Sequence, residues 1–519
     1  MGRRETDGVD TEQKQGQENP ESPPGANLSD DDLRGKYLTG FHLWLVFVAL
    51  ALSVFLIGLD FTIVATAIPA ITDEFHGIRD VAWYGPAIFL TAAGFTSAWG
   101  KVYKYFPLKS SYLVAILIFE LGSLICGVAP TSTTLIIGRV IAGVGGAGVA
   151  SGAYTIVGFI SEPKKRPAYT GTMGAAYGLT NALGPIIGGV FSQTTTWKWC
   201  FYVNLPVGAL SAVVITLFFK NPEYSKSKQH QATFATKAAQ MDIVGILLIM
   251  RAVISYILAV QYGGQAMPWS SQTLIGLLVA TGVILLLFSV WEYFQGERAM
   301  YTLFLGGAFF TMVYYLPIYF QSVQGAIPIG SGVRNLPFIL GSTLGSITSG
   351  LFISFTGLST PTMLGASAVG AVGCGVCILL DEKTTTGKWV GYQLVAGLAL
   401  GSGFQLPIIV GEASVDTGDI STVTAMLLFF QTLGGSLFLL PRLAPGVEPE
   451  KALSVGAGEI RRILSPQDVP GIVLGHTEGL VVTYSIAAAS AGVAFLTNLF
   501  LRWKRLDMDA LKQATTVGT

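Results

Sequence analysis

The sequence has little charge, and this shortage excludes an ordinary soluble protein. Asp, Glu, Lys and Arg make up 12% of the 519 residues, whereas a soluble domain spends about 25% of its residues on them. Hydrophobic residues make up 51%, and the mean hydropathy is +0.57. A water-soluble chain of this size needs a charged surface and cannot bury so large an apolar excess. The net charge is +0, so it gives no reason to expect a nucleic-acid partner.

Cysteine and histidine are also scarce, and their spacing predicts neither a disulfide framework nor a metal site. The four cysteines lie in or beside apolar runs, and the C-x-x-C pair Cys374 and Cys377 has no second pair nearby. We interpret them as small residues at helix interfaces. The four histidines are scattered, and no nucleophile elbow or metal spacing occurs. We therefore expect no enzyme, metal or cofactor.

What the sequence does have is a series of apolar runs, each long enough to cross a bilayer as a helix. Hydropathy predicts roughly fourteen of them, an all-α polytopic membrane protein. The expected spans are 43–66, 81–101, 111–129, 134–158, 168–191, 200–219, 242–262, 272–292, 301–321, 332–355, 361–380, 389–411, 420–440 and 479–501.

The Lys and Arg residues of the short loops predict the orientation. Alternate loops near 101–110, 161–167 and 220–240 carry most of these cations, and Arg502, Lys504 and Arg505 follow the last span. We therefore expect both termini in the cytoplasm. The predicted regions are a disordered tail (1–40), a first six-helix half (41–220), a loop with two inserted helices (221–300), a second half (301–505) with an outside loop (441–478), and a C-terminal tail (506–519).

Two charged residues fall inside apolar spans, where charge is costly and marks function. Asp60 lies in "LDFTIVATAIPAI", and Arg139 lies in the fourth span within "GRVIAGVGGAGVASG". A guanidinium cannot lose its proton and needs a partner. We expect Asp60 to bind a proton and Arg139 to pair with it, although a solvated Asp60 and a purely structural Arg139 are the simpler alternatives.

Two further motifs concern packing and closure. The fifth span contains "GLTNALGPIIGG", in which glycines offer a flat face and a proline removes one hydrogen bond. The loop "GKVYKYFPLKS" at 100–110 is cationic, and its lysines can pair with acidic groups or helix C-termini and so latch one conformation; a merely solvated loop is the alternative. The motif residues are Gly178, Gly184, Pro185, Gly188 and Gly189 in the span, and Gly100, Lys101, Lys104 and Lys109 in the loop.

These motifs, in this order, resemble the major facilitator superfamily, in particular its fourteen-span drug:H+ antiporters. "LDFTIVATAIP" and "GLTNALGPIIGG" are the specific marks, and the resemblance runs from about 40 to 505. Short segments such as "MVYYLPIYFQSVQG" and "LLFFQTLGGSLF" are most similar to fungal carriers that export toxins and other secondary metabolites. The loop at 100–110 departs from the superfamily pattern, because it lacks the usual Asp and Arg.

The resemblance implies two six-helix halves that rock about a central cavity, and a proton gradient that drives export of a small organic substrate. It implies that Asp60 carries the proton and Arg139 couples to it. We expect a monomer in the lipid bilayer of the plasma membrane, with the vacuolar membrane as the alternative. Candidate residues for the substrate cavity are Tyr154, Tyr177, Tyr315, Gln405 and Gln431, although the two glutamines can equally well join helices.

Two alternative functions stay open on the same fold. One is transport of another cargo, such as basic amino acids into the vacuole or a siderophore. The other is a sensor that does not transport, and its only support is two stretches shorter than in relatives. These are "GERAM" at 296–300, which runs directly into the next span, and the end of "GGSLFLLPRLAPG".

Overall fold

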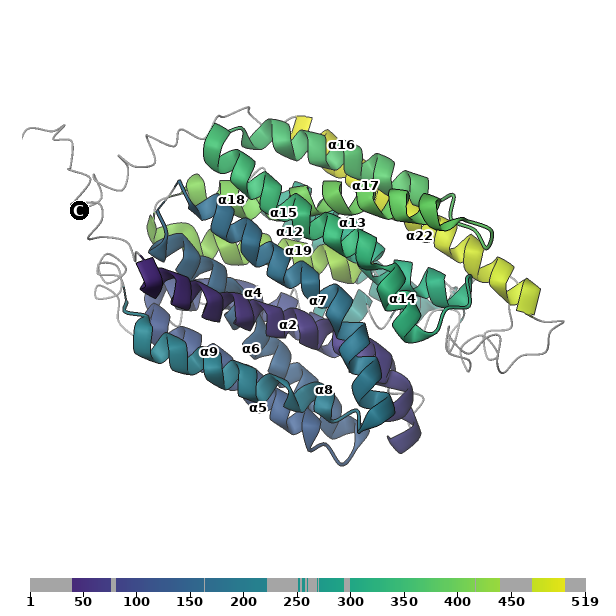
Figure 1. Ribbon diagram of the computed structural model, residues 1–519, viewed down its shortest axis with the longest axis horizontal. Coiled ribbons are helices and arrows are strands. Elements are labelled where there is room, and N and C mark those ends of the chain that lie inside the picture. Colours follow the sequence, from purple (N-terminus) through teal and green to yellow (C-terminus); the bar gives the residue numbers. More distant parts are fainter. Residues whose placement is uncertain are drawn as a thin grey trace, which may run out of the picture.

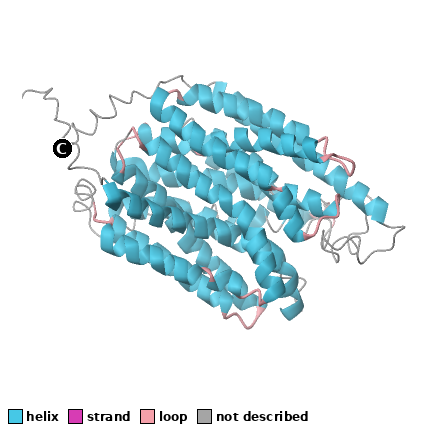
Figure 2. Cartoon of the chain, viewed as in Figure 1, coloured by secondary structure: helices cyan, strands magenta, loops and turns pink. Residues whose placement is uncertain are grey.

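The protein is an all-α bundle of long helices (Figures 1 and 2). The computed structural model describes residues 40–75, 81–162, 164–221, 272–293, 299–415, 417–438 and 469–499, with scattered positions between 251 and 271. Within these residues there is no β-strand. The predicted span at 242–262 and the shortened stretches near 296–298 and 439–468 lie largely or wholly outside them.

The described helices follow the predicted order. The first half contains α2 (Gly40–Phe75), α3 (Val81–Tyr84), α4 (Pro86–Tyr105), α5 (Leu108–Gly127), α6 (Ser132–Ile160), α7 (Arg166–Thr194), α8 (Trp199–Tyr202) and α9 (Asn204–Phe218). After α12 (Gln272–Tyr293), the second half contains α13 (Ala299–Ser322), α14 (Pro328–Arg334), α15 (Leu336–Thr356), α16 (Ser359–Cys377), α17 (Thr386–Phe404), α18 (Leu406–Ala413), the 3₁₀ turn η3 (Thr417–Asp419), α19 (Ile420–Phe438) and α22 (Val469–Leu499).

Four predicted spans are each broken into two successive helices, which corrects the expectation of single helices there. The breaks separate α3 from α4, α8 from α9, α14 from α15 and α17 from α18. A proline lies at or just after the start of the second helix of each pair: Pro86, Pro206, Pro337 and Pro407. Proline has no N–H to donate to the preceding turn, so the helical hydrogen bonding is interrupted there although the apolar run continues.

The last helix also differs from the prediction, because α22 begins at Val469 rather than at 479. Residues 469–478 include glycines, His476 and Glu478, which lowered the hydropathy of this part of the run. Helical hydrogen bonding tolerates such residues near a helix end. The predicted outside loop 441–478 is thus helical in its last ten residues.

Within the described residues, nine segments are long and apolar enough to cross a membrane. Large apolar side chains such as Leu117, Phe355 and Val372 are exposed on their outer faces, as expected for a surface that faces lipid. Helices α4 and α7 are not among the nine because small and polar residues are more frequent in them. Both contact helices of the opposite half.

The two halves lie side by side and meet through two matching pairs of helices (Figure 1). Helix α4 packs against α19, and α15 packs against α7. Both pairs have a close contact at the end of the bundle that carries residues 100–110, which we call the Lys-rich end. A Cβ on Gly100 would lie 2.5 Å from the Ala425 Cβ, and one on Gly171 would lie 2.5 Å from the Ser346 carbonyl oxygen. Side chains larger than hydrogen would therefore separate the halves at this end.

Candidate functional site

Asp60 and Arg139 form a buried ion pair in the first half. The Arg139 Nη1 atom lies 2.6 Å from the Asp60 Oδ2 atom, and each side chain is 1% exposed. Helix α2 supplies Asp60 and α6 supplies Arg139, whose Nε donates to the Tyr84 carbonyl at the end of α3. The Arg139 guanidinium also lies 5.8 Å from the centre of the Phe201 ring. The pairing predicted from two isolated charges is therefore present in the geometry.

A third polar residue completes this site, and sequence reasoning missed it. Asn204, the first residue of α9, donates to Asp60 Oδ1 at 3.2 Å and lies 3.2 Å from Ser123 Oγ. Its side chain is fully buried. Both carboxylate oxygens of Asp60 therefore have a donor, as a buried charge requires. A single Asn ahead of Pro206 in an apolar run was the available signal, but that pattern is also typical of a turn.

The glycines of α7 allow this helix to pack closely against two neighbouring helices. Cβ atoms on Gly184 or Gly188 would clash with Thr62 and Ile63 on α2, within one turn of Asp60. The Thr62 hydroxyl also donates to a carbonyl of α7 at 3.1 Å. Gly178 faces the second half, where a Cβ would lie 3.4 Å from the Thr343 Oγ1 atom on α15.

Helix α7 therefore lies between α2 and the second half. Pro185 is inside this helix, which continues to Thr194, and Gly189 is buried. The structure thus places Gly184 and Gly188 against α2 and Gly178 against the second half.

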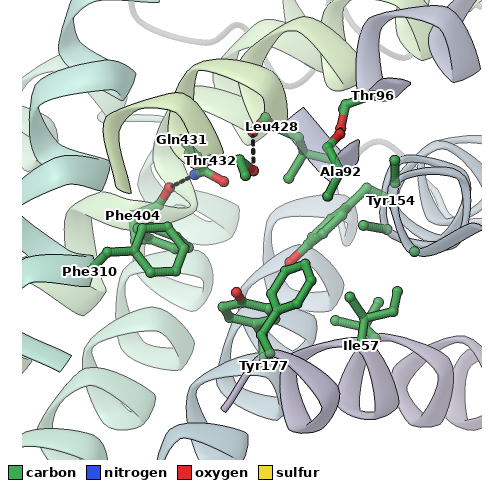
Figure 3. A pocket seen from close by; sticks show the side chains of 15 residues that line it. Ile57, Ala92, Thr96, Tyr154, Tyr177, Phe310, Phe404, Leu428, Gln431 and Thr432 are labelled. Atoms are coloured by element: carbon green, nitrogen blue, oxygen red, sulfur yellow. Dashed lines mark hydrogen bonds between the residues drawn. The ribbon is translucent and has the colours of Figure 1, made fainter. Parts of the chain in front are cut away.

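A cavity lies between the two halves beside this site. It is small, about 50 Å³, and its lining includes the predicted residues Tyr154, Tyr177 and Gln431. In Figure 3, Tyr154 and Tyr177 lie on one side, and Phe310 and Phe404 lie on the other. Ile57 and Phe61 of α2 also line it, so the wall of the cavity reaches the helix turn that carries Asp60.

The cavity wall is aromatic and carries few polar groups. Gln431 on α19 donates to the carbonyl of Phe404, the last residue of α17, at 2.5 Å (Figure 3). Of its fifteen lining residues, all within the described part, none is charged. Such a wall suits an amphipathic or uncharged organic molecule.

Two other predicted cavity residues do not line this cavity. Gln405, at the break after α17, donates to the Tyr154 hydroxyl at 3.1 Å and so joins the second half to the first. Tyr315 is 8% exposed and belongs to the core of the second half, where its carbonyl accepts a bond from Tyr484. The structure therefore brings together three of the five cavity candidates.

At the Lys-rich end, two lysines make the kinds of contact that the loop sequence predicts. Lys104 Nζ lies 2.7 Å from Asp419 Oδ1, and this ion pair joins α4 to the turn η3 of the second half. Lys109 donates to the carbonyl of Thr216, in the last turn of α9, at 2.6 Å. One lysine thus pairs with an acid of the opposite half, and the other caps a helix C-terminus.

The opposite end of the bundle carries a different ion pair, within the first half. Glu74 near the end of α2 accepts a bond from Trp197 Nε1 at 2.6 Å and pairs with Lys198 Nζ at 3.1 Å. Partial burial opposes ionisation, but the hydrogen bonds and the charge from these two residues prevail and lower the pKa of the Glu74 carboxyl.

Comparison with known proteins places this geometry in a family. Residues 50–439 match the Major Facilitator Superfamily. The chain is 44% identical to the MFS-type transporter grgE of Penicillium sp, over 92% of this chain and 89% of that protein. It is 43% identical to the probable efflux pump gsfJ of Penicillium aethiopicum, over 92% and 91% of the two chains.

Solved structures agree on the fold. The human organic anion transporter MFSD10 superposes with a TM-score of 0.59 at 12% identity, covering 89% of this chain and all of that one (100%). The proton:xylose symporter XylE gives a TM-score of 0.58 at 11% identity, covering 91% and 99%. At such low identity the likeness concerns the arrangement of helices alone.

Proposed function

This chain belongs to the Major Facilitator Superfamily and is a multi-pass membrane transporter rather than an enzyme, and we propose that it exports small amphipathic organic molecules in exchange for protons. The observation that carries the proposal is the buried pair of Asp60 and Arg139, one helix turn from the wall of the central cavity. A carboxylate in such a place is the group through which a proton can change the state of the bundle.

The ion pair gives Asp60 two states of different charge. In the charged state, Arg139 and Asn204 satisfy both carboxylate oxygens. When a proton neutralises Asp60, the guanidinium keeps its bonds to the Tyr84 and Asp60 carbonyl oxygens, so it retains hydrogen bonds in the protonated state too. Arg139 therefore permits both states, and Asp60 alone gains or loses the proton.

Helix α2 connects the protonation state of Asp60 to the shape of the cavity. Ile57 and Phe61 lie on the turns beside Asp60 and form part of the cavity wall. The glycines of α7 hold this stretch of α2 against the interface between the halves. A change in the charge of Asp60 thus biases both the shape of the cavity and the contact between halves, which is what exchange by alternating access requires.

The chemistry of the wall limits the cargo. Aromatic rings and amide or hydroxyl groups surround the cavity, and none of its described lining residues is charged. This wall favours an apolar or amphipathic molecule over a basic amino acid, which would need a carboxylate partner. Several of the similar proteins are named efflux pumps or probable efflux pumps, among them those of Penicillium aethiopicum and Trichophyton rubrum. We infer that the cargo is a fungal toxin or a similar secondary metabolite.

The remaining features follow from the same proposal. By the positive-inside rule, the lysines of the loop at 100–110 support a cytoplasmic location for the Lys-rich end. Export then requires the plasma membrane, and the proton gradient is the only energy source that this mechanism needs. One chain contains both halves and the cavity, so a monomer suffices.

The test is efflux of Nile red, an uncharged lipophilic dye, from cells that express the wild type or Asp60→Asn. We expect efflux from wild-type cells that stops when an uncoupler collapses the proton gradient, and little efflux from the variant at equal surface expression. Asn has nearly the shape of Asp, so loss of efflux would report loss of the proton. Wild-type efflux that continues in the presence of an uncoupler would overturn the proposal.

A further inference from the structure

A second buried carboxylate lies at the contact between the halves, away from Asp60. Glu412, in α18 of the second half, is 2% exposed. The Thr424 hydroxyl on α19 donates to its Oε1 atom at 2.9 Å. Its Oε2 atom is buried and has no hydrogen-bond partner. Glu412 is therefore a half-satisfied carboxyl group inside the bundle.

The unpartnered oxygen points at the first half. A Cβ on Gly158 of α6 would lie 3.5 Å from Glu412 Oε2 and 3.2 Å from a methyl carbon of Ile420. One helical turn before Gly158, Tyr154 accepts the bond from Gln405, which lies seven residues before Glu412. Glu412 thus lies between the cavity and the Lys-rich end, where the two halves meet.

The groups around Glu412 explain which protonation state this closed surface favours. A cation and a phenol interact electrostatically with it: Arg166 at the start of α7 and Tyr154 on α6. Arg166 favours the charged carboxylate but forms no ion pair with it within the described residues, and its Nε donates to the Ser161 carbonyl. A charged Glu412 would leave one buried oxygen without a donor, and the neutral acid carries less of this cost.

We propose that Glu412 is a second proton-binding site, which holds its proton while the halves are closed at the Lys-rich end and releases it as they open and water enters. This inference rests on the proposed alternating access and deepens it. It assigns to the second half a proton-dependent lock that is separate from the ion pair of Asp60. Opening at the Lys-rich end would accordingly be favoured as pH rises.

The experiment measures the distance between spin labels at the Lys-rich end, one in each half. The labels replace Ser110 at the start of α5 and Pro361 at the start of α16, both exposed. The four native cysteines are buried, so they compete little for the label. Gly171→Leu serves as the open reference, because a side chain there meets α15.

We expect the ratio of open to closed molecules to rise with pH in the wild type, by up to about tenfold per pH unit for one released proton. Glu412→Gln keeps the size and the bond from Thr424 but cannot titrate, so this pH dependence should be lost and the closed form should dominate. Asp60→Asn should keep the part that Glu412 contributes, even where it abolishes efflux. A Glu412→Gln variant that opens with pH like the wild type would overturn the proposal.

Two further variants separate titration from simple structural support. Thr424→Val removes the hydrogen bond and leaves the carboxyl, so the pH dependence should persist with its midpoint at higher pH. Glu412→Asp keeps a carboxyl and should restore a pH-dependent distance. If Thr424→Val loses the pH dependence as completely as Glu412→Gln does, the bond rather than the proton is what matters, and the inference fails.

Discussion

Two ion pairs of nearly equal length lie in different regions of this protein. Arg139 and Asp60 are 2.6 Å apart inside the first half, and Lys104 and Asp419 are 2.7 Å apart between the halves. The side chains of the first pair are 1% exposed, whereas those of the second are 24% and 41% exposed. The two pairs therefore have nearly the same distance between charged atoms but differ in exposure to solvent.

The difference in burial assigns each pair a different task. A buried pair cannot be separated without leaving an uncompensated charge, so its state changes only when a proton neutralises one partner. An exposed pair gains little from its contact and loses little when water replaces the partner. The first pair suits proton binding, and the second suits a contact that breaks and re-forms in every transport cycle.

Among the variants that test this difference, Arg139→Ala should cause the largest loss of stability. It leaves Asp60 buried beside Asn204 alone, and removal of one partner of a buried ion pair costs about 3–5 kcal/mol of folding free energy. Thermal unfolding of the purified protein in detergent measures the loss. The matched control is the double variant Asp60→Asn with Arg139→Gln, which removes both charges and should recover most of the stability. A single variant as stable as the wild type would contradict the assignment.

Lys104→Ala should have a smaller effect, confined to the contact between halves. An exposed pair contributes about 0.2–1 kcal/mol, so the ratio of closed to open molecules should fall by no more than about fivefold. The spin-label distance at the Lys-rich end measures this ratio, and the difference from the wild type should shrink in high salt. Lys104→Arg should behave like the wild type. A loss of folding in Lys104→Ala would show that this contact is not an exposed one.

Glu74→Gln should have the smallest effect, because its ion pair with Lys198 is exposed and lies within one half. The pKa of Glu74 is lowered from its ordinary 4.5, so its contribution to stability is present above that pH and is lost as pH falls through the lowered value. The wild type should therefore be slightly more stable than the variant at pH 7, and equally stable below the lowered pKa. Unfolding curves at both pH values check this, and a difference that grows in acid would contradict it.

The sequence predicts the fold and the buried charges well because both signals are strong. Membrane-length apolar runs are visible without knowledge of tertiary contacts, and a charge such as Asp60 or Arg139 contrasts with everything around it. The helix breaks near Pro86, Pro206, Pro337 and Pro407 were not predicted, because hydropathy does not change where an apolar run is merely interrupted in its helical hydrogen bonding.

The residues without a strong sequence signal were harder to predict. Asn204 and Glu412 lie near helix ends or breaks, where polar residues are usually solvated, and only the folded bundle buries them. The sequence offers no signal that separates Tyr315 from its neighbours in α13, because this helix is apolar on all sides and shows no periodicity that marks the face toward the cavity.

The most direct test of the account asks whether Asp60 moves the proton. Inside-out membrane vesicles that hold a proton gradient are monitored with a pH-sensitive fluorescent dye while Nile red is added as substrate. We predict that the wild type dissipates the gradient when Nile red is added. Asp60→Asn should still bind Nile red, as measured by quenching of tryptophan fluorescence, but should leave the gradient intact. Dissipation by Asp60→Asn at the wild-type rate would contradict the central claim that export is coupled to protons through this carboxylate.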